Sequence, residues 1–193
     1  MPDISEFPGY TLDEWKEWFV QTASLILSKC PSTGVTIFYQ SDIKHEGIWV
    51  DKSYLCQKAA ESLGHELLWH KIICRSPAGI ATFGRPAYSH MLCFSQELKV
   101  DISKSTADVI PDLGEKTWAR GMGLEACLIA ARFIKEQTQS KLTINPFCGE
   151  GSMLAAANAY ELIALGIERS PKRAEKAGVL TLIKDNKKWN FQK

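Results

Sequence analysis

A glycine-containing junction in the last third of the chain carries residue types that could bind an anionic ligand. Residues 142–152 read LTINPFCGEGS, in which a short apolar run stops at an Asn-Pro pair, and Gly149 and Gly151 lead into an alanine-rich segment from Ser152. Glycine has no Cβ, so a ligand can lie almost against the backbone. The start of the following helix adds a partial positive charge that favours an anionic group.

An acidic residue follows at the tip of the next predicted strand. Glu168 comes directly after the apolar segment 162–167. A carboxylate at that position can accept hydrogen bonds from both hydroxyls of a ribose. A dinucleotide fold would use the same two features, but its third glycine is replaced by Leu154, and the Gly-Lys-Ser/Thr of a phosphate loop is absent. An ordinary tight turn between a strand and a helix stays open as the alternative.

Strands and helices that alternate along the chain must position this junction. Thr11 and Glu14 form a capping-box pattern that begins a helix ending near Lys29. The periodicity predicts further helices over 51–63, 123–136, 152–160 and from Ser170, and strands over 35–39, 66–74, 88–95, 142–144 and 162–167. This alternation predicts an α/β fold with a mostly parallel sheet and helices on both faces, in a single domain over 1–193.

Composition limits the classes of function. The chain has 193 residues, of which 45% are hydrophobic and 23% charged, and its net charge of +1 gives no global field for a polyanion. The six cysteines show no C-x-x-C spacing and no metal-like clustering with the histidines, so we expect no metal site. We find no pattern of a signal peptide or a membrane span, and we expect a reducing cytoplasmic location.

The glycine junction, together with the later run Ala164-Leu165-Gly166-Ile167-Glu168, resembles the S-adenosylmethionine-binding half of the amino methyltransferases. This family is typified by the N6-adenine and N4-cytosine DNA methyltransferases and their RNA-modifying relatives. Its usual pattern is Asp-Pro-Phe-x-Gly-x-Gly-Thr, for which this chain has Asn145 and Ser152 in place of the Asp and the Thr. The resemblance implies S-adenosylmethionine as the cofactor. By the same resemblance its binding residues are Asn145, Pro146, Phe147, Cys148, Gly149, Gly151, Ser152 and Glu168, with Asp108, Ile110 and Trp118 from the preceding connector.

The order of the motifs resembles that of the circularly permuted members, in which the catalytic half precedes the cofactor half. The resemblance therefore implies a circularly permuted Rossmann-like methyltransferase fold, with residues 1–100 as the catalytic half and 101–193 as the cofactor half. The segment 85–95 resembles the strand that lines the pocket for the target base. Arg85 and Tyr88 are accordingly the candidates for substrate binding.

One motif of the family is missing. These enzymes polarise the target amine with [Asp/Asn/Ser]-Pro-Pro-[Tyr/Phe] at the tip of a strand before the first helix, and no such tetrapeptide occurs here. Asp3, near the expected place, is the candidate for the amine-facing acid, and a solvated acid is the alternative. Either residues precede this sequence, or the sheet is completed otherwise, or catalysis is lost or altered.

Other polar and aromatic residues have two interpretations. His65, His70 and His90 alternate with apolar residues on strands, as structural histidines do, although one could serve as a catalytic base. Trp49, Trp69 and Trp118 could stack on a base, whereas core packing suits Trp15, Trp18 and also Trp69. The C-terminal Lys184, Lys187, Lys188 and Lys193 with Trp189 could contact phosphates or form a solvated tail.

These observations lead to two hypotheses of different kinds. The first is a methyltransferase that modifies an exocyclic amine of a nucleic-acid base, with RNA, either tRNA or rRNA, favoured over DNA because no DNA-recognition module is visible. The second is a non-catalytic module of the same fold that binds the cofactor or RNA, or that acts as a partner subunit.

Overall fold

The computed structural model describes residues 1–186 and 188–192, and its contacts divide the chain into two compact units. The first unit is Met1–Pro111 and the second is Asp112–Lys193. These contacts divide the chain after Pro111, and the predicted catalytic and cofactor halves, 1–100 and 101–193, stay a prediction. That the two units make a single domain stays a prediction.

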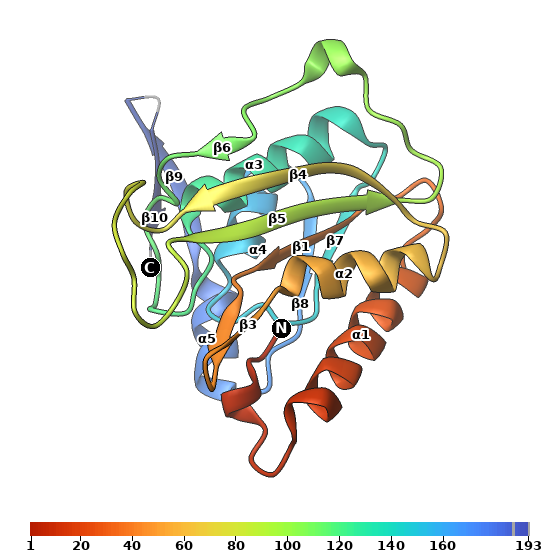
Figure 1. Ribbon diagram of the computed structural model, residues 1–193. Coiled ribbons are helices and arrows are strands. Elements are labelled where there is room, and N and C mark those ends of the chain that lie inside the picture. Colours follow the sequence, from red (N-terminus) through yellow and green to blue (C-terminus); the bar gives the residue numbers. More distant parts are fainter. Residues whose placement is uncertain (187, 193) are drawn as a thin grey trace. The chain divides into compact units, whose positions relative to one another are not determined.

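The first unit contains two helices, six strands and two short 3-10 segments among its described residues (Figure 1). In chain order these are a 3-10 turn Ile4–Glu6, α1 (Leu12–Ser28), β1 (Thr36–Gln40), β2 (Ile43–His45), β3 (Ile48–Val50), α2 (Lys52–Glu61), β4 (Glu66–Cys74), β5 (Tyr88–Ser95), a 3-10 turn Ile102–Lys104 and β6 (Val109–Ile110). Strands β2 and β3 form a hairpin whose two-residue turn holds Glu46 and Gly47, both at positive φ. The sequence analysis missed this hairpin because its strands have only three residues each.

The central sheet of the first unit has the order β1-β5-β4-β6. Strand β5 runs antiparallel to both of its neighbours, and only β6 joins β4 in parallel. The prediction of a mostly parallel sheet is therefore wrong for this unit. The cause is the connection between β4 and β5, which is a returning loop (residues 75–87) and not a helical crossover, so that consecutive strands pair directly and must run in opposite directions.

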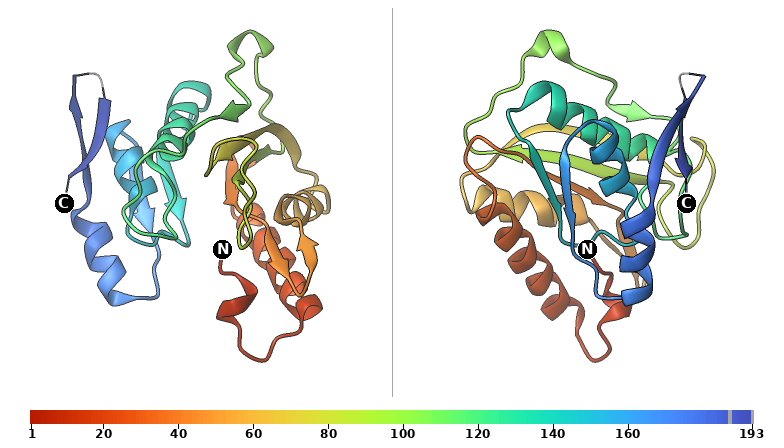
Figure 2. Two further views of the ribbon diagram at one scale, coloured as in Figure 1. Left: turned by 60° about the vertical axis from the view of Figure 1, so that its left-hand side comes forward. Right: turned by 180° about the vertical axis from the view of Figure 1, so that it is seen from behind.

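Helix α1 begins at the predicted capping box and contributes much of the core. The Thr11 hydroxyl accepts from the Glu14 backbone N–H, and the Glu14 carboxylate accepts from the Thr11 backbone N–H. Four residues at helical spacing, Trp15, Phe19, Ala23 and Leu27, are fully buried. They pack in one cluster with residues of α2, β1 and β5, among them Ala59, Phe38, Leu92 and Phe94. Helices α1 and α2 thus cover one face of the sheet (Figure 2).

The second unit contains α3 (Leu124–Gln137), β7 (Leu142–Asn145), α4 (Ser152–Ala159), β8 (Ile163–Gly166), α5 (Pro171–Val179), β9 (Thr181–Asp185) and β10 (Lys188–Gln192). Strands β7 and β8 are parallel, and the chain between them passes through α4, as in a β-α-β unit. Strands β9 and β10 form an antiparallel hairpin. Every predicted helix and strand of this unit is confirmed, to within a few residues at its ends.

The described C-terminal residues are paired in a hairpin, so they do not form a frayed tail, although Lys184 and Lys188 are exposed to solvent. Lys184 faces Trp189 across the β9–β10 hairpin, and the ammonium lies 5.4 Å from the centroid of the indole ring. Lys187 and Lys193 lie outside the described residues. In the described parts of both units, we find no helix with the length and apolar character that crossing a membrane requires.

The core of the first unit gives a test of this packing. We expect Phe19→Ala to lower the free energy of unfolding by about 3–5 kcal/mol, because the ring is completely buried and its removal leaves a cavity. Leu25→Ala on the same helix is the matched control, since Leu25 is 58% exposed, and it should change stability by less than about 0.5 kcal/mol. Urea denaturation of both variants measures the difference. Equal effects would contradict the described orientation of α1.

Candidate functional site

The glycine junction forms a tight turn from β7 into α4. The side-chain Oδ1 of Asn145 accepts a hydrogen bond of 3.1 Å from the backbone N–H of Phe147, which starts the turn. The backbone N–H of Gly151 then donates to the Cys148 carbonyl at 2.9 Å. Gly149 and Gly151 both have positive φ, at 57° and 87°, which only glycine adopts without cost.

The turn leaves backbone donors available. The N–H groups of Gly149 and Glu150 donate no hydrogen bond within the described residues. They lie next to the first turn of α4, whose own N–H groups have no carbonyl partner inside the helix. This segment is therefore a group of donors that suits an anionic ligand such as a carboxylate.

Close packing explains the glycines that hold the turn in place. A Cβ on Gly151 would lie 2.8 Å from Cα of Ala177 on α5. A Cβ on Gly166, at the end of β8, would lie 2.7 Å from the sulfur of Cys148. Both distances are shorter than any real contact, so these positions bring the turn, β8 and α5 together only when they lack a side chain.

Glu168 lies two residues beyond β8, at the same edge as the turn. Asn145 and Gly166 are paired across β7 and β8, so the carboxyl ends of the two strands are level. The Cys148 backbone N–H also donates to the Ile167 carbonyl at 3.1 Å, which fixes the turn beside the segment that leads to Glu168. The sequence predicted this juxtaposition from the spacing of the two motifs, and the structure confirms it.

The Glu168 carboxylate is largely buried and is held by local contacts. Its Oε1 accepts from the backbone N–H of Ser170 at 2.8 Å and lies 3.4 Å from Nε of Arg173. Its other oxygen has no partner among the described residues. The carboxylate is thus oriented by α5 and still has acceptor capacity for a hydroxyl group.

Trp118 lies over the turn. A Cβ on Gly149 would be 3.3 Å from the indole ring of Trp118, so the ring packs directly on the glycine. The Arg173 guanidinium lies 5.0 Å from the centroid of the same ring, which places it between Trp118 and Glu168. The hydroxyls of Thr117 and Ser152 are 3.1 Å apart and join this connector to the start of α4. A ligand on the turn would contact the Trp118 ring as well as the backbone.

The structure brings nine of the eleven predicted cofactor residues together in the second unit. These are Asn145, Pro146, Phe147, Cys148, Gly149, Gly151, Ser152, Glu168 and Trp118. Asp108 and Ile110 belong to the first unit instead, where Ile110 pairs with Ile73 in the sheet and the Asp108 carboxylate lies 3.8 Å from Nζ of Lys71. A cofactor role for these two residues stays a prediction.

Glu150 is a residue of the turn that the sequence analysis missed. It is only 7% exposed, and its carboxylate forms an ion pair with Lys176 on α5. A buried carboxylate needs such a partner. The pair helps to hold α5 against the turn. Glu150 stands between Gly149 and Gly151, where the family pattern accepts any residue. Its residue type alone therefore did not identify it as part of the site.

The predicted substrate residues lie in the first unit, and two of them form an ion pair. The Asp3 carboxylate accepts from Nζ of Lys52 and, at 3.3 Å, from the Arg85 guanidinium. Lys52 is almost completely buried, with its ammonium over the rings of Trp15 and Phe19. Asp3 is therefore not the solvated acid of the alternative interpretation, because it compensates a buried charge.

A second polar group of the first unit is a buried chain of three residues. Asp42 Oδ2 lies 3.0 Å from Nε2 of His90, and Nδ1 of His90 lies 2.9 Å from Nε2 of His70. Asp42 and His90 are buried, whereas His70 is half-buried. The ring of Tyr88, a predicted substrate residue, stands edge-on to the ring of His90 at a centroid distance of 5.2 Å. The sequence analysis recognised the histidines but missed Asp42, which lies two residues beyond a strand.

The charge state of this chain follows from its contacts. Burial raises the pKa of Asp42, but hydrogen bonds from His90, the Lys52 backbone N–H and the Trp49 indole outweigh burial, so the pKa is lowered from its ordinary value. Burial, and then the neighbouring His90, lower the pKa of His70. At pH 7 Asp42 is therefore an anion and His70 is neutral.

Asp42 and His90 also belong to a group that has the residue types of a metal site. Ligand atoms of Asp42, Asp51 and His90 all lie within 4.8 Å of one another. Each residue already has protein partners: Asp42 accepts from three donors, His90 bonds to His70, and Asp51 accepts from the Tyr54 backbone N–H at the start of α2. These contacts account for the cluster without an ion, so it does not carry a metal assignment.

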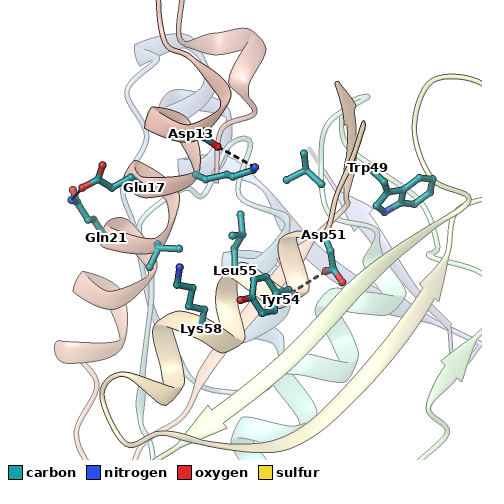
Figure 3. Close-up of a pocket in the computed structure, with 11 residues that line it drawn as sticks. Asp13, Glu17, Gln21, Trp49, Asp51, Tyr54, Leu55 and Lys58 are labelled. Carbon is teal, nitrogen blue, oxygen red and sulfur yellow. Dashed lines mark hydrogen bonds and ion pairs between the residues drawn. The ribbon is translucent and has the colours of Figure 1, made fainter. Parts of the chain in front are cut away.

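A groove of about 660 Å³ lies between α1, α2 and β3, and two of its lining residues, Trp49 and Asp51, also lie beside Asp42. Figure 3 shows its lining, which includes Glu17 and Gln21 on α1 and Tyr54 and Lys58 on α2. These four side chains are exposed, and of the aromatic residues that the sequence suggested for base stacking only Trp49 lines the groove.

The comparisons with known proteins bear on the fold. No protein-family model matches the chain, and no curated protein sequence is similar to it. Among solved structures, it is similar to TTHA0409 from Thermus thermophilus, assigned as a DNA modification methylase and solved with S-adenosyl-L-methionine, at 17% identity over 88% of this chain and 80% of that one, with a TM-score of 0.64. It is also similar to the cytosine-N4-specific PvuII DNA methyltransferase, at 12% identity over 86% and 70% of the two chains, with a TM-score of 0.68. The complex of M1.HpyAVI with S-adenosylmethionine matches at 14% identity over 88% and 83%, with a TM-score of 0.55.

These similarities define a class by its fold. The chain has the α/β fold of these methyltransferases, and the predicted fold class is confirmed to that extent. The circular permutation stays a prediction, and so do the individual site residues.

The buried histidine chain gives a prediction for stability against pH. The folded state holds His70 neutral below its ordinary pKa of 6.5, whereas the unfolded state takes up a proton there. The unfolded state then binds more protons, so the free energy of unfolding falls as the pH drops below about 6.5. Urea midpoints between pH 8 and pH 5 should show a steeper fall for the wild type than for His70→Gln. His45→Gln is the control for replacing a histidine in the same unit, and equal pH slopes for wild type and His70→Gln would refute the account.

Proposed function

We propose that this protein is a methyltransferase that uses S-adenosylmethionine and modifies an exocyclic amine of a nucleic-acid base. One observation carries the proposal: the available backbone donors of the glycine turn and the oriented carboxylate of Glu168 lie at the level ends of two parallel strands. In open α/β sheets, ligands bind beyond the carboxyl ends of the strands. The fold of the structural neighbours, two of which were solved with this cofactor, supports the same proposal.

The residues present fit the chemical groups of the cofactor. Glu168 has a free oxygen for the ribose hydroxyls, and the N–H groups of Gly149 and Glu150 with the start of α4 suit the methionine carboxylate. Trp118 offers an aromatic face beside the turn. When bound, the cofactor supplies an electrophilic methyl group. The contribution of the chain is then to hold donor and acceptor in line, which lowers the barrier by positioning.

We propose an amine of a base as the methyl acceptor, and the proposal covers both DNA and RNA. TTHA0409 and the PvuII enzyme are named as DNA methylases, so the comparisons do not support the preference for RNA that the sequence suggested. Arg85 and Tyr88 are proposed to contact the acceptor. Asp3 is proposed as the acid that faces the amine, with a carboxylate that Lys52 and Arg85 already hold in one orientation.

The first test is calorimetric titration with S-adenosylmethionine and S-adenosylhomocysteine. We expect micromolar binding by the wild type, and binding that is about 10- to 100-fold weaker for Glu168→Ala, because each lost hydrogen bond to a charged group is worth about 1.5–3 kcal/mol. Glu168→Gln keeps a side-chain oxygen that can accept from the Ser170 backbone N–H, so this variant removes the charge while the turn stays intact. Glu136→Ala, an exposed acid at the end of α3, is the matched control and should bind like the wild type.

Two results would change the conclusion. Absence of binding by a folded wild type would mean that the glycine junction is only a turn, and the proposal would fail. Binding without transfer of a tritiated methyl group to duplex DNA or to RNA would favour the second function, a non-catalytic module or partner subunit, which the missing Pro-Pro-aromatic tetrapeptide also favours.

A further inference from the structure

The loop between β4 and β5 carries an aromatic side chain that is almost fully exposed. Phe83 is 95% exposed, and Ile80 in the same loop (residues 75–87) is 54% exposed. A single exposed apolar residue is common on a protein surface and needs no explanation. The charge around Phe83 is distinctive, because the segment 67–96 contains three lysines and arginines and no aspartate or glutamate. The whole chain, in contrast, has 23 basic and 22 acidic residues.

Hydrogen bonds close this loop at its base. The backbone N–H groups of Arg75 and Ser76 both donate to the Ala87 carbonyl, at 2.6 and 3.1 Å. Pro86 is buried, whereas residues 77–81 and 83–85 are exposed. The loop, which is yellow-green in Figure 1, therefore leaves the β4–β5 pair from a fixed base and exposes its middle part to solvent.

A lysine of the β2–β3 hairpin lies beside the residue that precedes Phe83. Nζ of Lys44 donates to the Thr82 carbonyl at 3.0 Å, and the same ammonium lies 5.0 Å from the centroid of the Trp49 ring. The indole of Trp49 is held in turn, because its N–H donates to the buried carboxylate of Asp42 at 3.1 Å. Lys44 is exposed and has no carboxylate partner among the described residues. Its charge is therefore positioned beside the loop and available to an anion.

Two arginines belong to the loop itself. The Arg85 side chain is 44% exposed, and its guanidinium lies 3.3 Å from Asp3, whose carboxylate also accepts from the buried Lys52. A guanidinium has five N–H donors, so Arg85 keeps donors for a second anion. Arg75 is half-buried, with Nη1 3.5 Å from the Ser41 hydroxyl, and has no carboxylate partner in the described part of the chain. The exposed ring thus has a basic side chain before and after it in the loop, and a third from the hairpin.

An exposed aromatic ring among basic side chains favours a single strand of nucleic acid as the partner. Bases stack on aromatic faces, while lysine and arginine neutralise the phosphates between them. In a duplex the bases are already stacked on one another, and opening a step costs about as much as one stacked ring returns. An unpaired base has no such cost. A membrane also attracts cations and apolar side chains, but one aromatic and one aliphatic residue are a small anchor.

We propose that Phe83, Lys44, Arg75 and Arg85 form a binding surface for an unpaired stretch of nucleic acid. A base stacks on the Phe83 ring, and the basic side chains contact the adjoining phosphates. This inference rests on the proposed function for the choice of a nucleic acid, and it adds the form of the polymer, a single strand of DNA or RNA rather than an intact duplex. All four residues belong to the first unit, so the surface is complete without the second.

Fluorescence anisotropy in the absence of cofactor tests the surface directly. The probes are labelled single strands of mixed-sequence DNA and RNA, about 12 nucleotides long, and the DNA duplex of the same sequence. We expect the single strands to bind more tightly than the duplex. Phe83→Ala and Phe83→Leu should weaken their binding about 5- to 100-fold, whereas Phe83→Tyr should bind like the wild type, because only an aromatic ring stacks on a base.

The basic side chains are tested by the dependence of affinity on salt. Lys44→Gln keeps a donor for the Thr82 carbonyl but removes the charge, so the fall of affinity with rising salt should become shallower. The matched controls are Ile102→Ala and Lys104→Ala, which change exposed residues of the same unit after β5. Both should bind like the wild type. An unchanged urea midpoint for Phe83→Ala shows that the variant is folded.

The outcomes separate this surface from the proposed function. If the cofactor does not bind but the single strands do, the proposed function fails and the surface stands. Binding of the duplex as tight as that of the single strands would refute the preference for unpaired bases. Wild-type affinity in Phe83→Leu, or no binding of single strands by the wild type at low salt, would overturn the surface. Binding only to vesicles of phosphatidylcholine and phosphatidylserine would assign the loop to a membrane instead.

Discussion

The parallel pairing of β7 with β8 is the constraint on which the candidate cofactor site depends. It makes Asn145 and Gly166 level, so that two loops leave the sheet side by side. The turn after β7 packs closely on α5 and on the end of β8 because glycine removes the side chain at the points of contact, at Gly151 against Ala177 and at Gly166 against Cys148. The backbone donors of one loop and the carboxylate of the other consequently lie at one edge of the pair of strands.

Two of the buried charged side chains of the first unit are each compensated by partners within the unit. Lys52 is compensated by Asp3, and Asp42 by three hydrogen-bond donors. Both arrangements lie near the start of α2, where the Lys52 backbone N–H also donates to Asp42. Such groups are costly unless every partner is in place. The donors around Asp42 and the carboxylate of Asp3 supply these partners.

Much of the second unit could be predicted from the sequence because its signals are local. The glycines, the proline at the start of α5 and the acid after β8 each define a backbone position or a strand end within a few residues. The first unit was predicted less well, because the order β1-β5-β4-β6 depends on pairing between distant segments. The buried contact between Asp42 and His90 illustrates the limit, because the two residues are 48 positions apart in the sequence and no periodicity relates them.

The short strands were missed for a related physical reason. Strands of two or three residues, such as β6 and the β2–β3 hairpin, have no alternation long enough to recognise and form only because neighbours supply hydrogen bonds. The ion pair of the buried Glu150 with the exposed Lys176 likewise depends on how α5 packs against the turn. Residue types suggest a site, whereas tertiary pairing decides which side chains share it.

The central claim is that the glycine turn and Glu168 form one binding site, and two-dimensional amide NMR with S-adenosylhomocysteine tests it most directly. The account predicts that the largest changes in chemical shift upon titration fall on Gly149, Glu150 and Glu168, because two of these amides donate to no other group among the described residues and the third lies beside the ligand. The amide chemical shifts of the β9–β10 hairpin should not change, except at the first residues of the hairpin. Shifts confined to other segments, or none at saturating ligand, would contradict the claim.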